Sequence, residues 1–380
     1  MFTKRKELIL SLITILIAVI LVCVLVEILL RVFTPDWLEF RMKEVKPNQA
    51  VEIGSDRQWP VVEIDDEFKS FTPQATFEVT HFEYSNIANI DEYGGRITNY
   101  YDQEILVPFF GDSFTFGVGV EDQQTYVSLL SKPGQGRFLN LGAPGIALDK
   151  QLDLLEMRYQ ELGQPKTIIF SLFIGNDFVD IYENYTQKNS VNGKTKKKQP
   201  TLLFRINKWV YRMEFTRRMY SFQFVRQKLL SLLNRNNPQH MNPIFREART
   251  DTPFLREANT LFLKELQRLK QLADTLKFEY YFIVLPDLHQ INQTIMLLKA
   301  NYYNIDLANL DMKAPNRLLA ENFVNNGIDF IDVTECLKND AHIDKLFYTH
   351  DTHLTQYGHE ITAKCLEREG FSRFLKTRRY

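Results

Sequence analysis

The stretch Phe110-Gly111-Asp112-Ser113-Phe114-Thr115-Phe116-Gly117 decides how the rest of the chain is interpreted. The apolar run 105–110 leads directly into it, and a β-branched and aromatic run that stops at Gly-Asp-Ser is typical of a buried strand ending in a sharp turn. A helix signal follows at 122–131. Ser113 is therefore expected where a strand ends and the chain turns toward a helix, which is where open α/β sheets bind ligands. The tripeptide alone also fits an ordinary polar turn, so the other motifs decide between the two.

Composition indicates a folded chain but names no partner. The 380 residues allow one large domain or two modest ones, and 44% apolar with 24% charged residues excludes a disordered chain. The formal net charge is −1. Cys23, Cys336 and Cys365 show neither metal-ligand spacing nor a disulfide framework. Only Cys336 and Cys365 could pair outside a membrane, and the sequence does not require that they do.

The N-terminus predicts a membrane anchor. A Lys-Arg-Lys triplet at 4–6 precedes an apolar run over 8–26, and the apolar character ends near Phe33. About 20 residues suffice to cross a bilayer, and no small-residue cleavage site follows. We expect an uncleaved signal anchor over 1–33, with a buried helix of a soluble protein as the alternative. The basic flank favours a cytoplasmic N-terminus and an extracytoplasmic remainder.

The next segment, 34–102, is interpreted as a spacer and packing arm. The alternation over 76–84 predicts a strand or hairpin, and 91–96 predicts a turn.

From residue 103 the pattern alternates between strand and helix. Predicted strands are 105–110, 137–141, 167–173, 280–285 and 328–333; predicted helices are 122–131, 148–159, 255–276, one ending near 326, and 356–368. Thr355 is a candidate N-cap for the last helix. Five strands alternating with helices imply an α/β domain over 103–380 whose parallel sheet is covered on both faces.

A basic helical insertion interrupts this domain at about 184–254. Residues 185–250 contain 15 lysines or arginines and only two acids, Glu214 and Glu247, and Lys194 begins an exposed loop that ends at Pro200. Aromatic residues alternate with arginines after that loop. The segment is interpreted as a lid or as a surface for anionic headgroups near the anchor. A pair of ordinary solvated helices is the alternative, and a nucleic-acid surface fits poorly with an exported domain.

Polar residues gather at the predicted strand ends and at one C-terminal loop. They are Gly111-Asp112-Ser113, Asn140 to Gly145, Gly175-Asn176-Asp177 and Asp351-Thr352-His353. Because the carboxyl ends of parallel strands share one edge, these residues are expected to converge. Acyl transfer by serine needs a hydroxyl, a base, a group that orients the base, and donors for the oxyanion. Ser113, His353 and Asp351 can supply the first three, provided that Asp351 lies in a loop, because positions i and i+2 of a helix point apart.

These four blocks resemble, in order and spacing, the sequence blocks of the SGNH (GDSL) hydrolases. The resemblance covers roughly 103–183 and 255–370, and it implies a flavodoxin-like three-layer α/β/α sandwich and a two-step serine esterase mechanism. It makes Ser113 the nucleophile, His353 the general base and Asp351 its orienting carboxylate. It places Gly145 and Asn176, with the backbone of Ser113, in the oxyanion hole. Many members have the aspartate three residues before the histidine, where this chain has His350.

That departure bears on the subfamily and on the role of Asp351. The Asp-x-His spacing is also found in membrane-anchored relatives and in SGNH-type polysaccharide acetyltransferases. The anchor and spacer look like those of bacterial membrane-tethered members, which implies a periplasmic or cell-surface location.

The same residues allow competing interpretations. His350, Asp351, His353 and His359 include a ligand-like spacing for a metal. His289 was considered as a second base but fits a structural role better. A lone Gly-x-Gly at 117–119 lacks a phosphate-loop lysine, and Thr115 replaces the second glycine of a Gly-x-Ser-x-Gly elbow. Asp112 and Asp177 were expected to bind loop backbone.

The sequence thus predicts a membrane-anchored serine esterase that needs no cofactor or metal. Its substrate would be an ester-bearing small molecule, glycan or lipid, such as an O-acyl carbohydrate. It would contact the membrane through the N-terminal helix, with the basic segment 188–235 as a second candidate surface, and would not bind nucleic acid. The alternatives are an O-acyltransferase acting on an envelope polysaccharide and a non-catalytic envelope-binding module.

Overall fold

The computed structural model describes residues 2–44, 49–52, 61–64, 68–99, 106–132, 137–192, 218–233, 241–250 and 252–375. The chain divides into two compact units. One comprises 1–46, 195–240 and 298–305, and the other comprises 47–194, 241–297 and 306–380. Each unit is considered by itself.

The larger unit is built on a five-stranded parallel sheet, as predicted. Its strands are β6 (Leu106–Gly111), β7 (Arg137–Gly142), β8 (Thr167–Phe173), β9 (Glu279–Leu285) and β10 (Phe330–Asp332), in the order β10-β9-β8-β6-β7. This is the flavodoxin-like order, in which connections leave the first strand in opposite directions. The expected strand 328–333 is shorter in the structure, because only Phe330–Asp332 pairs with β9.

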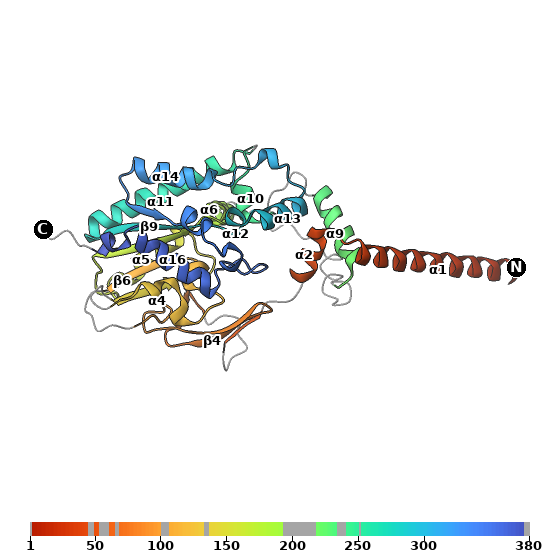
Figure 1. The fold of residues 1–380 in the computed structure, drawn as a ribbon, viewed down its shortest axis with the longest axis horizontal. Helices are drawn as coiled ribbons and strands as arrows, with labels where there is room; N and C mark the ends of the chain where they lie inside the picture. Colours follow the sequence, from red (N-terminus) through yellow and green to blue (C-terminus); the bar gives the residue numbers. More distant parts are fainter. Residues whose placement is uncertain are drawn as a thin grey trace. The chain divides into compact units, whose positions relative to one another are not determined.

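Helices cover both faces of this sheet (Figure 1). One face carries α4 (Tyr126–Leu130), α15 (Thr334–Lys338) and α16 (Gln356–Arg368). The other carries α5 (Leu148–Arg158), α6 (Asp177–Asn192), α11 (Phe254–Leu276) and α14 (Ala314–Asn325). The three-layer sandwich is therefore confirmed. Shorter elements are α3 (Ser113–Phe116), η1 (Asp122–Gln124), α10 (Pro243–Glu247), α12 (Leu288–Ile291), α13 (Gln293–Tyr303), η3 (Leu307–Asn309), η4 (Ile343–Lys345) and η5 (Phe371–Leu375).

Threonine side chains cap the N-termini of two helices. The expected helix 122–131 is split into η1 and α4 because Thr125 is extended, with its side chain accepting from Ser128 N–H. Thr355 caps α16 in the same way, accepting from Gly358 N–H, as predicted.

The N-terminal arm of this unit forms small antiparallel sheets. β4 (Thr76–His81) and β5 (Tyr84–Asn89) make the expected hairpin, and β1 (Gln49–Glu52) pairs with β4. β2 (Val61–Ile64) pairs with β3 (Phe68–Phe71). The predicted turn at 91–96 is also present, closed by Asp91 N–H to the Gly95 carbonyl at 2.7 Å.

One disulfide, Cys336–Cys365, joins α15 to α16. The sequence left this pairing open. It lies within the apolar layer between these helices and the sheet.

The smaller unit contains α1 (Phe2–Val32), α2 (Asp36–Glu44) and α9 (Tyr220–Leu233). The segment Ile13–Val32 is long and apolar enough to cross a membrane, with a mean hydropathy of 3.2, and it is not buried by protein. The predicted loop 194–200 and the residues after it up to 217 lie outside the described residues.

Candidate active site

Ser113 is the first residue of the short helix α3, directly after β6. Asp112 caps this helix, its Oδ1 accepting the Phe114 N–H at 2.9 Å. The turn needs glycine at 111, because a Cβ there would lie 2.1 Å from Thr115 Oγ1. The Gly-Asp-Ser motif therefore makes a tight strand-to-helix turn that leaves Ser113 half-buried while its neighbours are buried.

His353 lies against Ser113, although 240 positions separate them in the chain. The distance from His353 Nε2 to Ser113 Oγ is 2.8 Å. The opposite ring nitrogen, Nδ1, is bonded to Asp351 Oδ1. With Nδ1–H donating to the carboxylate, Nε2 is the acceptor for the serine hydroxyl. The structure thus brings together all three residues that the sequence placed in a triad.

The short Asp-x-His spacing works because of the residue in between. Thr352 has φ +75°, a left-handed conformation that β-branched residues rarely adopt. This turns the chain enough for the side chains of Asp351 and His353 to meet. Backbone bonds from Thr352 N–H to the Tyr348 carbonyl (3.0 Å) and from Tyr348 N–H to the His353 carbonyl (2.8 Å) close the loop.

The site lies at the topological switch point of the sheet. β6 has β7 on one side and β8 on the other, and the connections diverge there. Asn140, near the end of β7, donates through Nδ2 to the Thr115 carbonyl at 2.7 Å. On the β8 side, the Phe173 ring stacks on Phe114, with centroids 3.6 Å apart. Both neighbouring strand ends therefore pack on the turn that carries Ser113.

The two remaining oxyanion candidates have different settings. Asn176 is half-buried at the start of α6, and its Nδ2 donates to Asp180 Oδ2 at 2.6 Å, which leaves the second N–H of the amide for another acceptor. Gly145 is exposed, with φ +75° and open space where a side chain would be.

Several acids behind the Gly-Asp-Ser turn have raised pKa values. Burial raises the pKa of Asp112 to about 6 and that of Asp180 to about 7, and the charge of Asp112 adds to the shift at Asp180. Burial, followed by the charges of Asp112 and Asp180, raises the pKa of Asp177 well above its usual range. Asp177 Oδ2 accepts the Phe173 N–H at 2.9 Å, so both motif aspartates bind loop backbone as predicted.

His289 and His359 are buried and are bonded to residues other than Ser113. His289 is buried, bonded through Nδ1 to Asp287 at 2.5 Å, and packs against Phe245. His359 is buried too; its Nδ1 accepts the Tyr126 N–H at 3.1 Å, and burial lowers its pKa to about 3. Within the described residues, no three His, Cys, Asp or Glu side chains are grouped to hold a metal ion.

Three residues outside the sequence blocks also touch the site. Glu83 and Tyr84, from the β4–β5 hairpin, contact the loop that carries Asp351. Arg96 is fully buried and pairs with Asp122 at 2.8 Å. It also donates hydrogen bonds to the carbonyls of Phe116 (3.0 Å) and Gly117, at the end of α3. The alternating pattern predicted the hairpin, but no sequence signal marks these side chains, since a turn glutamate or a lone arginine is usually solvated.

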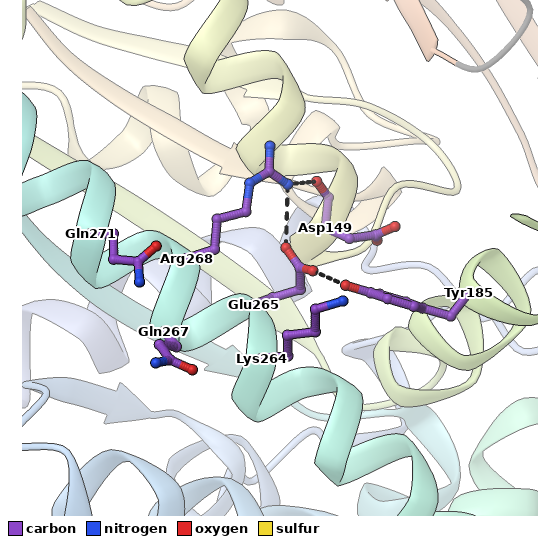
Figure 2. Close-up of a pocket in the computed structure, with 7 residues that line it drawn as sticks. All are labelled: Asp149, Tyr185, Lys264, Glu265, Gln267, Arg268 and Gln271. Carbon is purple, nitrogen blue, oxygen red and sulfur yellow. Dashed lines mark hydrogen bonds and ion pairs between the residues drawn. The ribbon is translucent and has the colours of Figure 1, made fainter.

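A separate cavity of about 560 Å³ lies between α5, α6 and α11 (Figure 2). Arg268 binds the Asp149 carbonyl and the Glu265 carboxylate, and Tyr185 donates to the same glutamate. The charged groups around this cavity are thus largely paired with one another, and the network ties the three helices together.

No protein-family model matches the sequence, and no curated protein matches it. Solved structures do match. A lipolytic protein of the G-D-S-L family from Veillonella parvula is 14% identical, with 71% of this chain and 99% of that chain covered and a TM-score of 0.36. A lipase/acylhydrolase from Enterococcus faecalis is 12% identical, with 71% and 96% covered and a TM-score of 0.38.

A psychrotrophic esterase from Pseudoalteromonas is 8% identical, with 72% and 100% covered and a TM-score of 0.36. The GDSL family is the one that the four sequence blocks resemble. We base the functional proposal on the residues of this chain.

Proposed function

We propose that this chain is a serine ester hydrolase of the SGNH type that acts through an acyl-enzyme on Ser113. The observation that carries the proposal is the continuous chain of hydrogen bonds from Asp351 through His353 to Ser113 at the switch point of the sheet. A hydroxyl, a base and an orienting carboxylate in that order are what acyl transfer by serine requires.

The geometry supports a two-step reaction. Ser113 Oγ attacks the ester carbonyl carbon as its proton passes to His353 Nε2, and Asp351 stabilises the imidazolium. The carbon–oxygen bond to the alcohol breaks, and Nε2 returns the proton to the leaving oxygen. Water then attacks the acyl carbon and gives a proton to His353 Nε2. The bond from the acyl carbon to Ser113 Oγ breaks, Nε2 returns the proton to Oγ, and the carboxylic acid leaves.

The negative oxygen formed in each step needs donors. We propose the backbone N–H of Ser113, the backbone N–H of Gly145 and the free N–H of the Asn176 side chain for this role. Fixed donors of this kind typically contribute about 10²–10³-fold in kcat each. The bond from Asn176 to Asp180 would hold the amide in one orientation.

We further propose that the chain is anchored in a membrane by α1, with the hydrolase unit on the extracytoplasmic side. The apolar segment Ile13–Val32 and the basic N-terminal flank support this topology. The Cys336–Cys365 disulfide supports an oxidising compartment. An ester-bearing glycan or lipid of the envelope would then be the accessible substrate.

The helix α9 supports a membrane contact of the basic segment 188–235. Glu27, within the apolar span, accepts the N–H groups of Tyr220 (3.1 Å) and Ser221 (2.8 Å), so its carboxylate holds the start of α9. Farther along α9, Val225 and Leu229 are exposed on adjacent turns. A helix fixed to the end of a membrane span and exposing apolar side chains suits the interface with lipid.

The proposed activity is tested with the full-length protein in detergent micelles. Wild type is expected to hydrolyse short-chain aryl esters and to bind a fluorophosphonate covalently, whereas Ser113→Ala should do neither. Equal inactivity of wild type and Ser113→Ala across acyl lengths would refute it. With an oligosaccharide present, acyl-sugar formed at the expense of free acid would favour the O-acyltransferase alternative.

A further inference from the structure

Glu83 lies in the turn between β4 and β5 and binds the backbone beside the triad. Its carboxylate accepts three consecutive N–H groups, from Thr349 (3.0 Å), His350 (3.1 Å) and Asp351 (2.8 Å). Successive N–H groups that face one point form an anion-binding concavity, and here the anion is a side chain of the same protein. Charge-assisted bonds of this type are about twice as strong as neutral ones.

The same hairpin also touches the Asp351 side chain. Tyr84 interacts with the Asp351 carboxylate and helps to lower its pKa. Burial, followed by the charge of Asp351, raises the pKa of Tyr84 far above its usual range, so the hydroxyl remains a donor. The Tyr84 ring lies against Tyr348, 4.7 Å between centroids, and the Tyr348 hydroxyl donates to the Gly119 carbonyl at 2.8 Å.

The loop itself needs such support. Thr352 holds a left-handed backbone between Asp351 and His353, a strained conformation that persists only where the surroundings impose it. Glu83 fixes the residues immediately before Thr352. Asp351 is thereby held at its backbone by Glu83, and Tyr84 of the same hairpin interacts with its carboxylate.

We propose that Glu83 is a positioning residue for the reaction, with Tyr84 as its companion. The β4–β5 hairpin then contributes to catalysis, because it fixes the position of Asp351 and thereby the orientation of the His353 ring. This inference rests on the proposed function.

The test uses full-length protein in detergent and measures kcat, KM and fluorophosphonate labelling rate. Glu83→Ala is expected to lower kcat and the labelling rate about 10²-fold, as a misplaced catalytic group does, with KM within about twofold of wild type. Glu83→Gln keeps an oxygen acceptor and should recover most of the loss. Tyr84→Phe removes one hydroxyl and should lower kcat about tenfold, as expected for loss of one bond to a charged group.

Glu78→Ala is the matched control. Glu78 lies on the same hairpin, is exposed, and accepts only the Ser85 hydroxyl at 2.8 Å among the bonds described, so kcat should stay at the wild-type value. Thermal midpoints are measured for every variant.

The outcomes separate the two proposals. If Ser113→Ala abolishes labelling but Glu83→Ala and Tyr84→Phe keep the wild-type kcat, the positioning role is wrong and the proposed function stands. Equal losses in Glu83→Ala and Glu83→Gln, or a parallel change in kcat and KM, would also overturn it. If wild type is labelled no faster than Ser113→Ala, the proposed function fails first. Should Glu83→Ala not fold, Tyr84→Phe and Glu83→Gln decide.

Discussion

Asp351 and the acids behind the Gly-Asp-Ser turn are carboxyl groups of one region, yet their pKa values shift in opposite directions. Burial alone would raise the pKa of Asp351, but the charge and hydrogen bond of His353, with lesser help from His81 and Tyr84, bring it below its usual range. Asp177 is surrounded instead by Asp112, Asp180 and Glu247, which add to the effect of burial and raise its pKa. The pKa of an aspartate beside these motifs thus falls where its neighbours donate hydrogen bonds or carry positive charge, and rises where they carry negative charge.

The largest expected effect on kcat comes from removing the negative charge of Asp351. Asp351→Asn keeps the size of the side chain but removes the charge and favours the wrong tautomer of His353, so kcat should fall about 10⁴-fold. Ester hydrolysis with saturating substrate measures it. If kcat falls by less than about tenfold, Asp351 does not orient the base.

The same aspartate-to-asparagine replacement should have little effect on activity at Asp177. Asp177→Asn substitutes a neutral amide for a carboxyl group whose pKa is raised, and the amide oxygen can still accept the Phe173 N–H. We expect kcat/KM within about fivefold of wild type, equivalent to about 1 kcal/mol, and a thermal midpoint at pH 7.5 that is unchanged or higher. A loss comparable with that of Asp351→Asn would show that Asp177 works as an anion.

The smallest effect concerns the dependence of stability on pH. Asp180 has a pKa of about 7 in the folded chain and near 4 when unfolded, so between these values the folded state binds more protons and stability falls as pH rises. Burial lowers the pKa of His359, which acts in the opposite direction but only below about pH 6.5, where an unfolded histidine takes up a proton. Between pH 6.5 and 8, the change in the free energy of unfolding therefore reflects the carboxyl groups whose pKa is raised.

Asp180→Asn is expected to flatten this decline. Thermal or denaturant unfolding of both proteins at pH 6.5 and pH 8 measures the difference, with Glu78→Ala, at an exposed position of the β4–β5 hairpin, as the control that leaves the slope in this window unchanged. An identical slope in wild type and Asp180→Asn would mean that Asp180 is already ionised at pH 6.5.

Local sequence patterns predicted most of the fold because each element carries its own signal. The apolar runs at β6 and β8 and the periodic spacing in α5 and α11 are properties of neighbouring residues. The split at Thr125 was missed, since its side chain caps α4 inside an otherwise helical pattern.

The candidate triad was also available from the sequence, but its supports were not. The positions of Ser113, Asp351 and His353 follow from motif order, and the structure puts them in contact. Glu83 lies some 270 residues before Asp351 in the chain, in a turn where an acid is ordinarily solvated. No local sequence pattern predicts this contact, because the Glu83 carboxylate binds backbone N–H groups, which every residue except proline has.

The sequence by itself determined the parallel sheet, the N-terminal apolar helix and the identity of the residues at the Gly-Asp-Ser edge. These depend on hydrophobic periodicity and on turn residues, which act over a few positions. Only the tertiary structure decided that an aspartate two positions before His353 can reach its ring, through a left-handed Thr352. It also decided that the β4–β5 hairpin holds that aspartate, because the energy of a buried carboxylate depends on donors brought from distant parts of the chain.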